Sequence, residues 1–276
     1  MSNIYNYNEI MTPTIAINNY PITNDIKSKV NQYRNEIIDI FNFKTYKYLV
    51  ILRVKFNQIN EIIDLCNEII EMKNNNLVIM LYFDFYQNSL LINPLEEETN
   101  NINLGLSLIR KLFIEIADKI PIVLKYNDTI LPQYFSDIVS LVITNNYQLA
   151  SGLSQPVLIE KTNLTTTLEY TNLSLKKQSF FGIKEDGNIT FIETKGNKNT
   201  FSVINMTDYN EEFEGKIVIN RIEIMEIENY LKKENISGFI INQFDKEMIN
   251  KIQSKITINL NKYNKNIFEK IYDNYM

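Results

Sequence analysis

The chain contains no histidine and a single cysteine, Cys66, so none of its side chains has an unperturbed pKa near neutrality. A catalytic zinc site and a serine–histidine pair are thereby excluded. Cys66 lies within NEIIDLCNEII, on the apolar face of a predicted helix, where a buried, inert thiol is favoured over a nucleophile. Acid–base chemistry must therefore come from carboxylates, lysine or tyrosine in surroundings that shift their pKa.

The composition is that of a globular protein of barrel size, with 276 residues, 45% of them hydrophobic and 22% charged. A net charge of -5 argues against binding to nucleic acid or to an anionic membrane. The amino-terminal stretch MSNIYNYNEI lacks the layout of a signal peptide, and no apolar run reaches the roughly 18 residues of a spanning helix. Because a lone cysteine fits a reducing compartment, we expect a cytoplasmic protein.

Short apolar runs alternate with amphipathic helical patterns along the chain, and the runs are typical of strands buried on both faces. Predicted strands cover 48–54, 77–83, 122–125, 141–144, 157–160, 200–205, 216–220 and 238–242. Predicted helices cover 25–41, 59–72, 104–119, 131–139, 148–153, 164–177 and the end of the chain from about Asn264. About eight strands alternating with helices predict a parallel (β/α)8 barrel of TIM type.

Three segments carry a more specific signal: GLSLIRKL from Gly105, LPQYFSDIVS from Leu131 and QLASGLSQPV from Gln148. Their order and spacing resemble the central part of the class I 3-deoxy-D-arabino-heptulosonate-7-phosphate (DAHP) synthases, with PQY and LASGLS matching almost letter for letter. The resemblance implies a TIM-type barrel. It also implies a family whose enzymes join phosphoenolpyruvate to erythrose 4-phosphate around a divalent metal.

The resemblance also implies how the chain is divided. Residues 1–46 would form an N-terminal extension and lead helix, with an extended lead-in over PTIAINNYPIT, residues 13–23. A hairpin would be inserted at about 179–195, where Lys184-Glu185-Asp186-Gly187 is typical of the turn. Since the link over 206–215 is short where the family has a full helix, the barrel is expected to be eroded. We expect a single domain over 1–276.

The family's catalytic groups are largely replaced at the positions that match its motifs. The four metal ligands fall at Lys55, Glu223, Asn242 and about Ile258, so no metal site and no catalytic residue is expected. The phosphate-binding positions fall at 85–88 (FYQN), Glu160 with Lys161 next to it, and Asn205, and one further segment is missing between Asn146 and Tyr147.

The retained segments line an aromatic amino-acid effector pocket in the family. Carried over by position, this pocket would comprise Pro132, Gln133, Leu149, Gly152, Leu153, Ser154, Phe180 and Ile192. A pocket serine of the family becomes Gly182. The alternative is that these segments pack a subunit interface, and that alternative is favoured.

These observations favour a non-catalytic, DAHP synthase-like pseudoenzyme, kept as a self-associating structural or interaction protein. We expect a homodimer joined through the lead-in at 13–23. An unidentified protein partner and an aromatic amino acid are its further candidate ligands. We expect no cofactor and no binding to nucleic acid or membrane. The alternative is a working DAHP synthase of the shikimate pathway.

Overall fold

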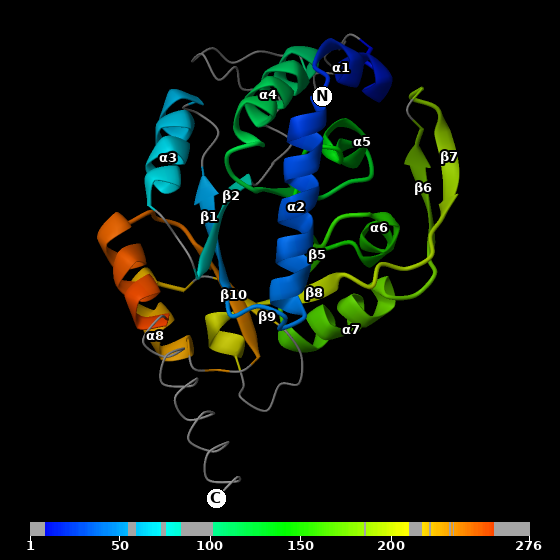
Figure 1. Ribbon diagram of the computed structural model, residues 1–276. Helices are drawn as coiled ribbons and strands as arrows, with labels where there is room; N and C mark the ends of the chain where they lie inside the picture. Colours follow the sequence, from blue (N-terminus) through cyan, green and yellow to red (C-terminus); the bar gives the residue numbers. More distant parts are fainter. Residues whose placement is uncertain are drawn as a thin grey trace, which may run out of the picture.

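Eight parallel strands close into a barrel in the order β1-β10-β9-β8-β5-β4-β3-β2 (Figure 1). The computed structural model describes residues 9–54, 59–72, 76–83, 102–184, 186–209, 217–220, 222–231, 233 and 235–256. The barrel strands are β1 (Tyr48–Val54), β2 (Leu77–Phe83), β3 (Ile122–Tyr126), β4 (Leu141–Thr144), β5 (Val157–Glu160), β8 (Thr200–Asn205), β9 (Ile217–Asn220) and β10 (Ile236–Ile241). The predicted (β/α)8 barrel is confirmed, with small shifts at the strand ends.

Helices cover the outside of the barrel, as predicted. They are α2 (Asn24–Phe41), α3 (Ile59–Glu71), α4 (Ile102–Ile116), α5 (Leu131–Phe135), α6 (Tyr147–Gly152), α7 (Leu164–Ser174) and α8 (Ile227–Tyr230), with 3-10 turns η2 (Met206–Asp208) and η3 (Ile224–Glu226). A helix over 246–256 was not predicted, and the one expected from Asn264 lies outside the described residues. Among the helices of the described ranges, none has the length and apolarity needed to cross a bilayer.

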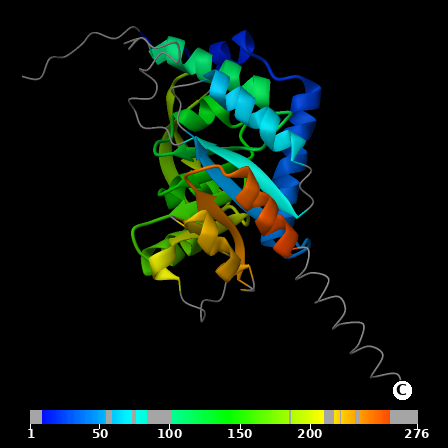
Figure 2. The same ribbon diagram turned by 90° about the vertical axis from the view of Figure 1, so that its left-hand side faces the viewer.

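The interior of the barrel is filled by alternate residues of each strand, because successive side chains of a strand point to opposite faces. Leu49 and Ile51 of β1 belong to this inner cluster, together with Met80, Leu158, Val203 and their counterparts on the other strands. The last turn of α2 closes the end where the strands begin, with Phe41 stacked on Phe201 at 3.9 Å between ring centroids. Figure 2, turned by 90°, shows α2 (blue) to one side of the barrel.

The lead-in segment is helical, and the prediction of an extended conformation is wrong. Thr12 caps helix α1 (Pro13–Asn19) by accepting from the Ile15 amide, and Pro13 occupies a position at the start of the helix that favours proline. Pro13 and Ala16 are buried, and the Tyr134 hydroxyl donates to the Met11 carbonyl at 2.6 Å. This segment therefore packs on its own barrel, although Ile15 remains 50% exposed.

The inserted hairpin is present as a separate two-stranded sheet, β6 (Ser179–Ile183) and β7 (Ile189–Glu193). Gly187 in its turn has a φ of 86°, a conformation that favours glycine, and the Lys184 amide donates to the Asn188 carbonyl at 2.8 Å. In Figure 1 the hairpin stands at the edge of the molecule, beside α5 and α6.

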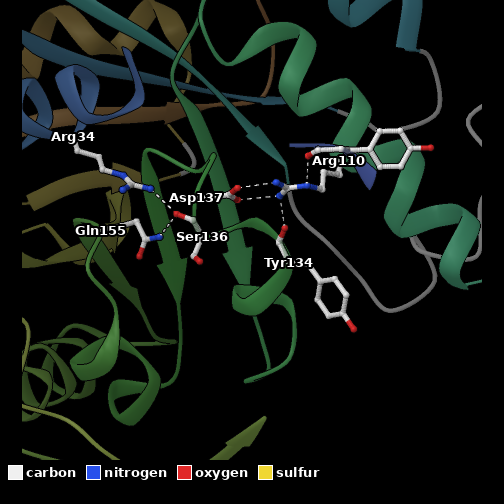
Figure 3. A network of polar contacts seen from close by, with 7 residues as sticks. Arg34, Arg110, Tyr134, Ser136, Asp137 and Gln155 are labelled. Carbon is white, nitrogen blue, oxygen red and sulfur yellow. Dashed lines mark hydrogen bonds and ion pairs between the residues drawn. The ribbon is translucent and has the colours of Figure 1, made fainter. Parts of the chain in front are cut away.

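A buried guanidinium ties the amino-terminal segment to the α4–α5 side of the barrel (Figure 3). Arg110 on α4 is fully buried and donates to the Tyr20 carbonyl at 2.8 Å and the Tyr134 carbonyl at 2.7 Å. It also makes a two-pronged contact with the Asp137 carboxylate, at 2.9 and 2.7 Å. A planar guanidinium suits such a site, because its donors fork toward several acceptors at once.

A second arginine strengthens the same region from α2. Arg34 donates to the Ser136 carbonyl at 2.6 Å and to the Val139 carbonyl at 2.7 Å. Gln155 also donates to the Ser136 carbonyl, at 2.6 Å. The segment between α5 and β4 is therefore held from two sides, which explains how the short helix α5 keeps its place.

We predict that Arg110→Met lowers the free energy of unfolding by about 3 to 5 kcal/mol, because it leaves the Asp137 carboxylate and two carbonyls without their donor. Urea denaturation monitored by circular dichroism measures this loss. Lys111→Met, at the exposed neighbouring position of α4, is the matched control and should change stability by less than about 0.5 kcal/mol. Equal stability of the two variants would show that the Arg110 network is unimportant.

Candidate functional site

The structure brings part of the expected effector pocket together, between α6 and the hairpin. Phe180 and Ile192 are directly paired across the hairpin. A Cβ atom at Gly152, the last residue of α6, would lie 3.6 Å from the Phe180 ring and 3.0 Å from the Thr194 methyl group. At Gly182, a Cβ atom would lie 2.6 Å from Ile192, so the place of the family's pocket serine is filled by an apolar side chain.

Polar contacts anchor the hairpin to α6. The Gln148 side chain donates to the Ser179 carbonyl at 3.1 Å, and the Ser151 and Thr194 hydroxyls lie 2.7 Å apart. Of the other expected pocket residues, Leu149 is buried in α6, Leu153 caps that helix, and Ser154 follows it in an exposed position. Pro132 and Gln133 lie on a different helix, α5.

The single thiol is buried, as the sequence predicts. Cys66 has no exposed surface, and burial raises the pKa of its thiol to about 11, although Lys119 acts in the opposite direction. The thiol is therefore protonated at neutral pH and is not a nucleophile.

The described residues do not fit the divalent metal of the family. Glu223 and Asn242 are both exposed, while Lys55, Ile258 and residues 85–88 lie outside the described ranges. Within those ranges, no three histidine, cysteine, aspartate or glutamate side chains are grouped so that they could hold a metal ion. We therefore derive no chemical step through a metal.

A cluster of polar residues that the sequence analysis did not propose as a site lies at the carboxyl end of the barrel. The Lys125 ammonium of β3 lies 3.0 Å from the Glu160 carboxylate of β5, and the Asn220 amide of β9 donates to the same carboxylate at 2.7 Å. Strand β4 separates β3 from β5, and β8 separates β5 from β9. Contacts across an intervening strand place these three side chains inside the barrel.

The alternation along the strands agrees with this placement. Lys125, Glu160 and Asn220 each follow, two residues later, an inner-cluster residue of the same strand: Val123, Leu158 and Val218. The side chains of Lys125 and Glu160 are 19% and 20% exposed, so the pair sits at the mouth rather than in the sealed interior. We call these three residues the mouth cluster.

The same alternation of inward and outward side chains places Arg53, near the end of β1, at the mouth of the barrel. It follows the inner residues Leu49 and Ile51, and its guanidinium carbon lies 5.1 Å from the centre of the Tyr82 ring. Within the described part of the chain, the buried Nε of Arg53 has no hydrogen-bond partner. Asn205 of β8 pairs in register with Asn220, which extends the polar rim to a further strand.

The mouth therefore offers a primary amine, a carboxylate beside it and a guanidinium two strands away. An amine and a carboxylate in contact can exchange a proton, and a guanidinium whose Nε has no partner in the described ranges can bind a carboxylate or a phosphate. These four residues could have been found from the sequence by marking every second residue of each predicted strand as inward-facing. Each of them is the last or next-to-last residue of its strand. Barrel enzymes carry their active sites at that end.

Comparisons with known proteins point to one kind of enzyme. A phospho-2-dehydro-3-deoxyheptonate aldolase from Corynebacterium glutamicum is 25% identical over 221 residues, which cover 72% of this chain and 60% of that protein. The phenylalanine-inhibited aldolase of the same name from Saccharomyces cerevisiae is 25% identical over 76% of this chain and 64% of its own length. The chain thus spans less than two thirds of these curated relatives. No family model matches.

A solved phospho-2-dehydro-3-deoxyheptonate aldolase from Francisella tularensis superposes with a TM-score of 0.76 at 19% identity, covering 87% of this chain and 86% of that one. This superposition confirms the predicted barrel fold. The prediction that the chain is not an enzyme is contradicted, because its relatives are named as aldolases and no observation shows a loss of activity. In sequence and in fold, the chain is a distant relative of the phospho-2-dehydro-3-deoxyheptonate aldolases, the DAHP synthases that its motifs resemble.

Proposed function

We propose that the protein catalyses aldol-type carbon–carbon bond formation at the carboxyl mouth of its barrel, the class of reaction for which its relatives are named. The substrates would be a three-carbon donor and erythrose 4-phosphate, and the product a 3-deoxy-2-oxo sugar acid phosphate. The observation that carries this proposal is the mouth cluster, in which Lys125, Glu160 and Asn220 meet from three different strands.

Physical chemistry supports a functional reading of this cluster. A charged pair placed among apolar layers loses hydration, and apolar side chains of the same size would stabilise a barrel equally well or better. Part of the Lys125–Glu160 pair remains in contact with solvent, as a group that meets a substrate must. A pair of this kind in a barrel mouth is therefore better explained by chemistry than by stability.

We predict product formation when the protein is incubated with erythrose 4-phosphate and either phosphoenolpyruvate or pyruvate, with and without manganese. Lys125→Met and Glu160→Gln should each lower the rate about 100-fold or more, because both remove a proton-transfer group. Lys161→Met is the control, since Lys161 lies over the Tyr170 ring at 4.0 Å and is outside the mouth cluster. Absence of product with every donor, in the presence and absence of the metal, would contradict the proposal.

We also propose that the site between α6 and the hairpin binds an aromatic amino acid and that this binding regulates the protein. The support is the apolar surface shared by Gly152, Phe180 and Ile192. Pro132, Gln133, Leu149, Leu153 and Ser154 would complete the site.

Phenylalanine, tyrosine or tryptophan should then raise the Tm in a thermal-shift assay, with a stabilisation on the order of 1 kcal/mol at ten times Kd. Gly152→Ile should abolish the shift, because a larger side chain there meets Thr194 and Phe180. Thr165→Ile, which places the same side chain at an exposed position of α7, should keep it. Flat melting curves with all three amino acids would leave only interface packing for these segments.

We further propose a homodimer, joined through the outer face of the hairpin as well as through the amino-terminal segment. Phe181, Ile189 and Phe191 are 70%, 79% and 56% exposed, and the two phenylalanine rings contact each other edge to face at 5.5 Å. Large apolar side chains gathered on one exposed sheet face are typical of an interaction surface. A two-fold dimer would cover the same face on both subunits.

The intact chain should therefore sediment as a dimer at micromolar concentration, and Phe181→Ser combined with Phe191→Ser should shift it toward monomer. The matched control is Met225→Ser, which removes an apolar side chain that is 72% exposed elsewhere on the surface. An intact chain that sediments as a monomer, or a double variant that remains dimeric, would contradict an interface on the hairpin.

A further inference from the structure

The amine of Lys125 stands at the centre of the mouth cluster. Its partner Glu160 is itself fixed by Asn220 at 2.7 Å, so the carboxylate is held by a strand on each side. This arrangement orients an amine and a proton acceptor toward the same small volume. It differs from a surface ion pair, in which two long side chains find each other in solvent.

Aldol chemistry requires that the donor carbonyl be activated, and two kinds of group achieve this: a metal ion or an amine that forms an imine. The described residues do not supply the metal-binding set of the relatives, whereas they do supply an amine at the mouth. We propose that Lys125 is the catalytic amine and that it forms an iminium with the carbonyl carbon of a 2-oxo acid. This inference rests on the proposed function and names its donor class.

The step balances in atoms and charge. Lys125 passes a proton from its ammonium to Glu160, and the free amine adds to the carbonyl carbon to give a carbinolamine. Glu160 returns that proton to the carbinolamine oxygen, which leaves as water as the carbon–nitrogen double bond forms. One ammonium and one carbonyl thus yield one iminium and one water. Glu160, again a carboxylate, can then accept the proton from the carbon next to the iminium.

Arg53 is the reason why we infer that the donor is a 2-oxo acid and not an uncharged ketone. Its buried Nε has no partner in the described ranges, and the guanidinium is held beside the Tyr82 ring. Strands β1 and β3 flank β2, and the register places Arg53 level with Val123, two residues before Lys125. The backbones of Arg53 and Lys125 are therefore about 12 Å apart, a distance that two long inward-pointing side chains can reduce to the size of a small acid. A carboxylate next to the carbonyl can then contact Arg53 while the carbonyl carbon meets Lys125.

Borohydride trapping tests this inference without requiring turnover. The whole chain is incubated with pyruvate and sodium borohydride, and peptide mass mapping locates any reduced adduct. We expect one adduct per chain, on Lys125, with Arg53→Met and Glu160→Gln each lowering the trapping rate at least tenfold. Lys125→Arg, which keeps the positive charge, should give no adduct, while Lys161→Arg should be labelled on Lys125 like the unchanged chain.

The results separate this inference from the proposed function. A lack of adduct, or labelling spread over surface lysines, overturns the role of Lys125 even when the condensation product forms. An adduct confined to Lys125 supports the inference even when the assay with erythrose 4-phosphate yields nothing, and in that case only the proposed reaction fails. Because the mapping uses the unchanged chain, this outcome does not depend on whether any variant folds.

Discussion

An eight-stranded barrel is narrow, and its inward side chains have to fill the space that the strands enclose. In this chain the lower layers are apolar, from Leu49 and Phe201 near the closed end to Ile51 and Val203 above them, and Phe41 of α2 seals the end below. The top layer contains opposite charges, from Lys125 and Glu160, which converge on one small volume from strands that are not neighbours. Like charges at these two positions would repel each other inside the mouth. The register of the strands therefore decides both the packing of the core and the chemistry of the rim.

Much of the fold could be predicted from the sequence, because strands buried on both faces appear as continuous apolar runs such as YLVILRV and LVIMLYF. The short helix α1 was missed, although Thr12 before Pro13 is a capping pair of the kind that begins helices. The helix over 246–256 was also missed, although Ile249, Ile252 and Ile256 repeat at helical spacing and are buried. At the lead-in, the resemblance to an extended segment of the family outweighed a local signal that was present.

The mouth cluster shows a different limit of sequence reading. Glu160 is 35 residues from Lys125 and 60 from Asn220, so no local motif joins them. Only the closure of the barrel brings them together. A position-by-position check against the motifs of the relatives counts Glu160 and Asn205 as losses, and that count led to the wrong prediction of a protein that is not an enzyme. The replacement of one catalytic set says little about whether the new residues form another.

Within the described ranges the hairpin pairs with no barrel strand. Phe180 and a few polar contacts, including those of Ser179 and Thr194 with α6, join it to the body. Local unfolding follows such boundaries, since a unit with few contacts opens at a lower free energy than the core. The backbone amides of β6 and β7 should therefore exchange with solvent deuterium while the barrel ladder stays protected. A segment that opens separately can also change its length during evolution without shifting the register on which the barrel depends.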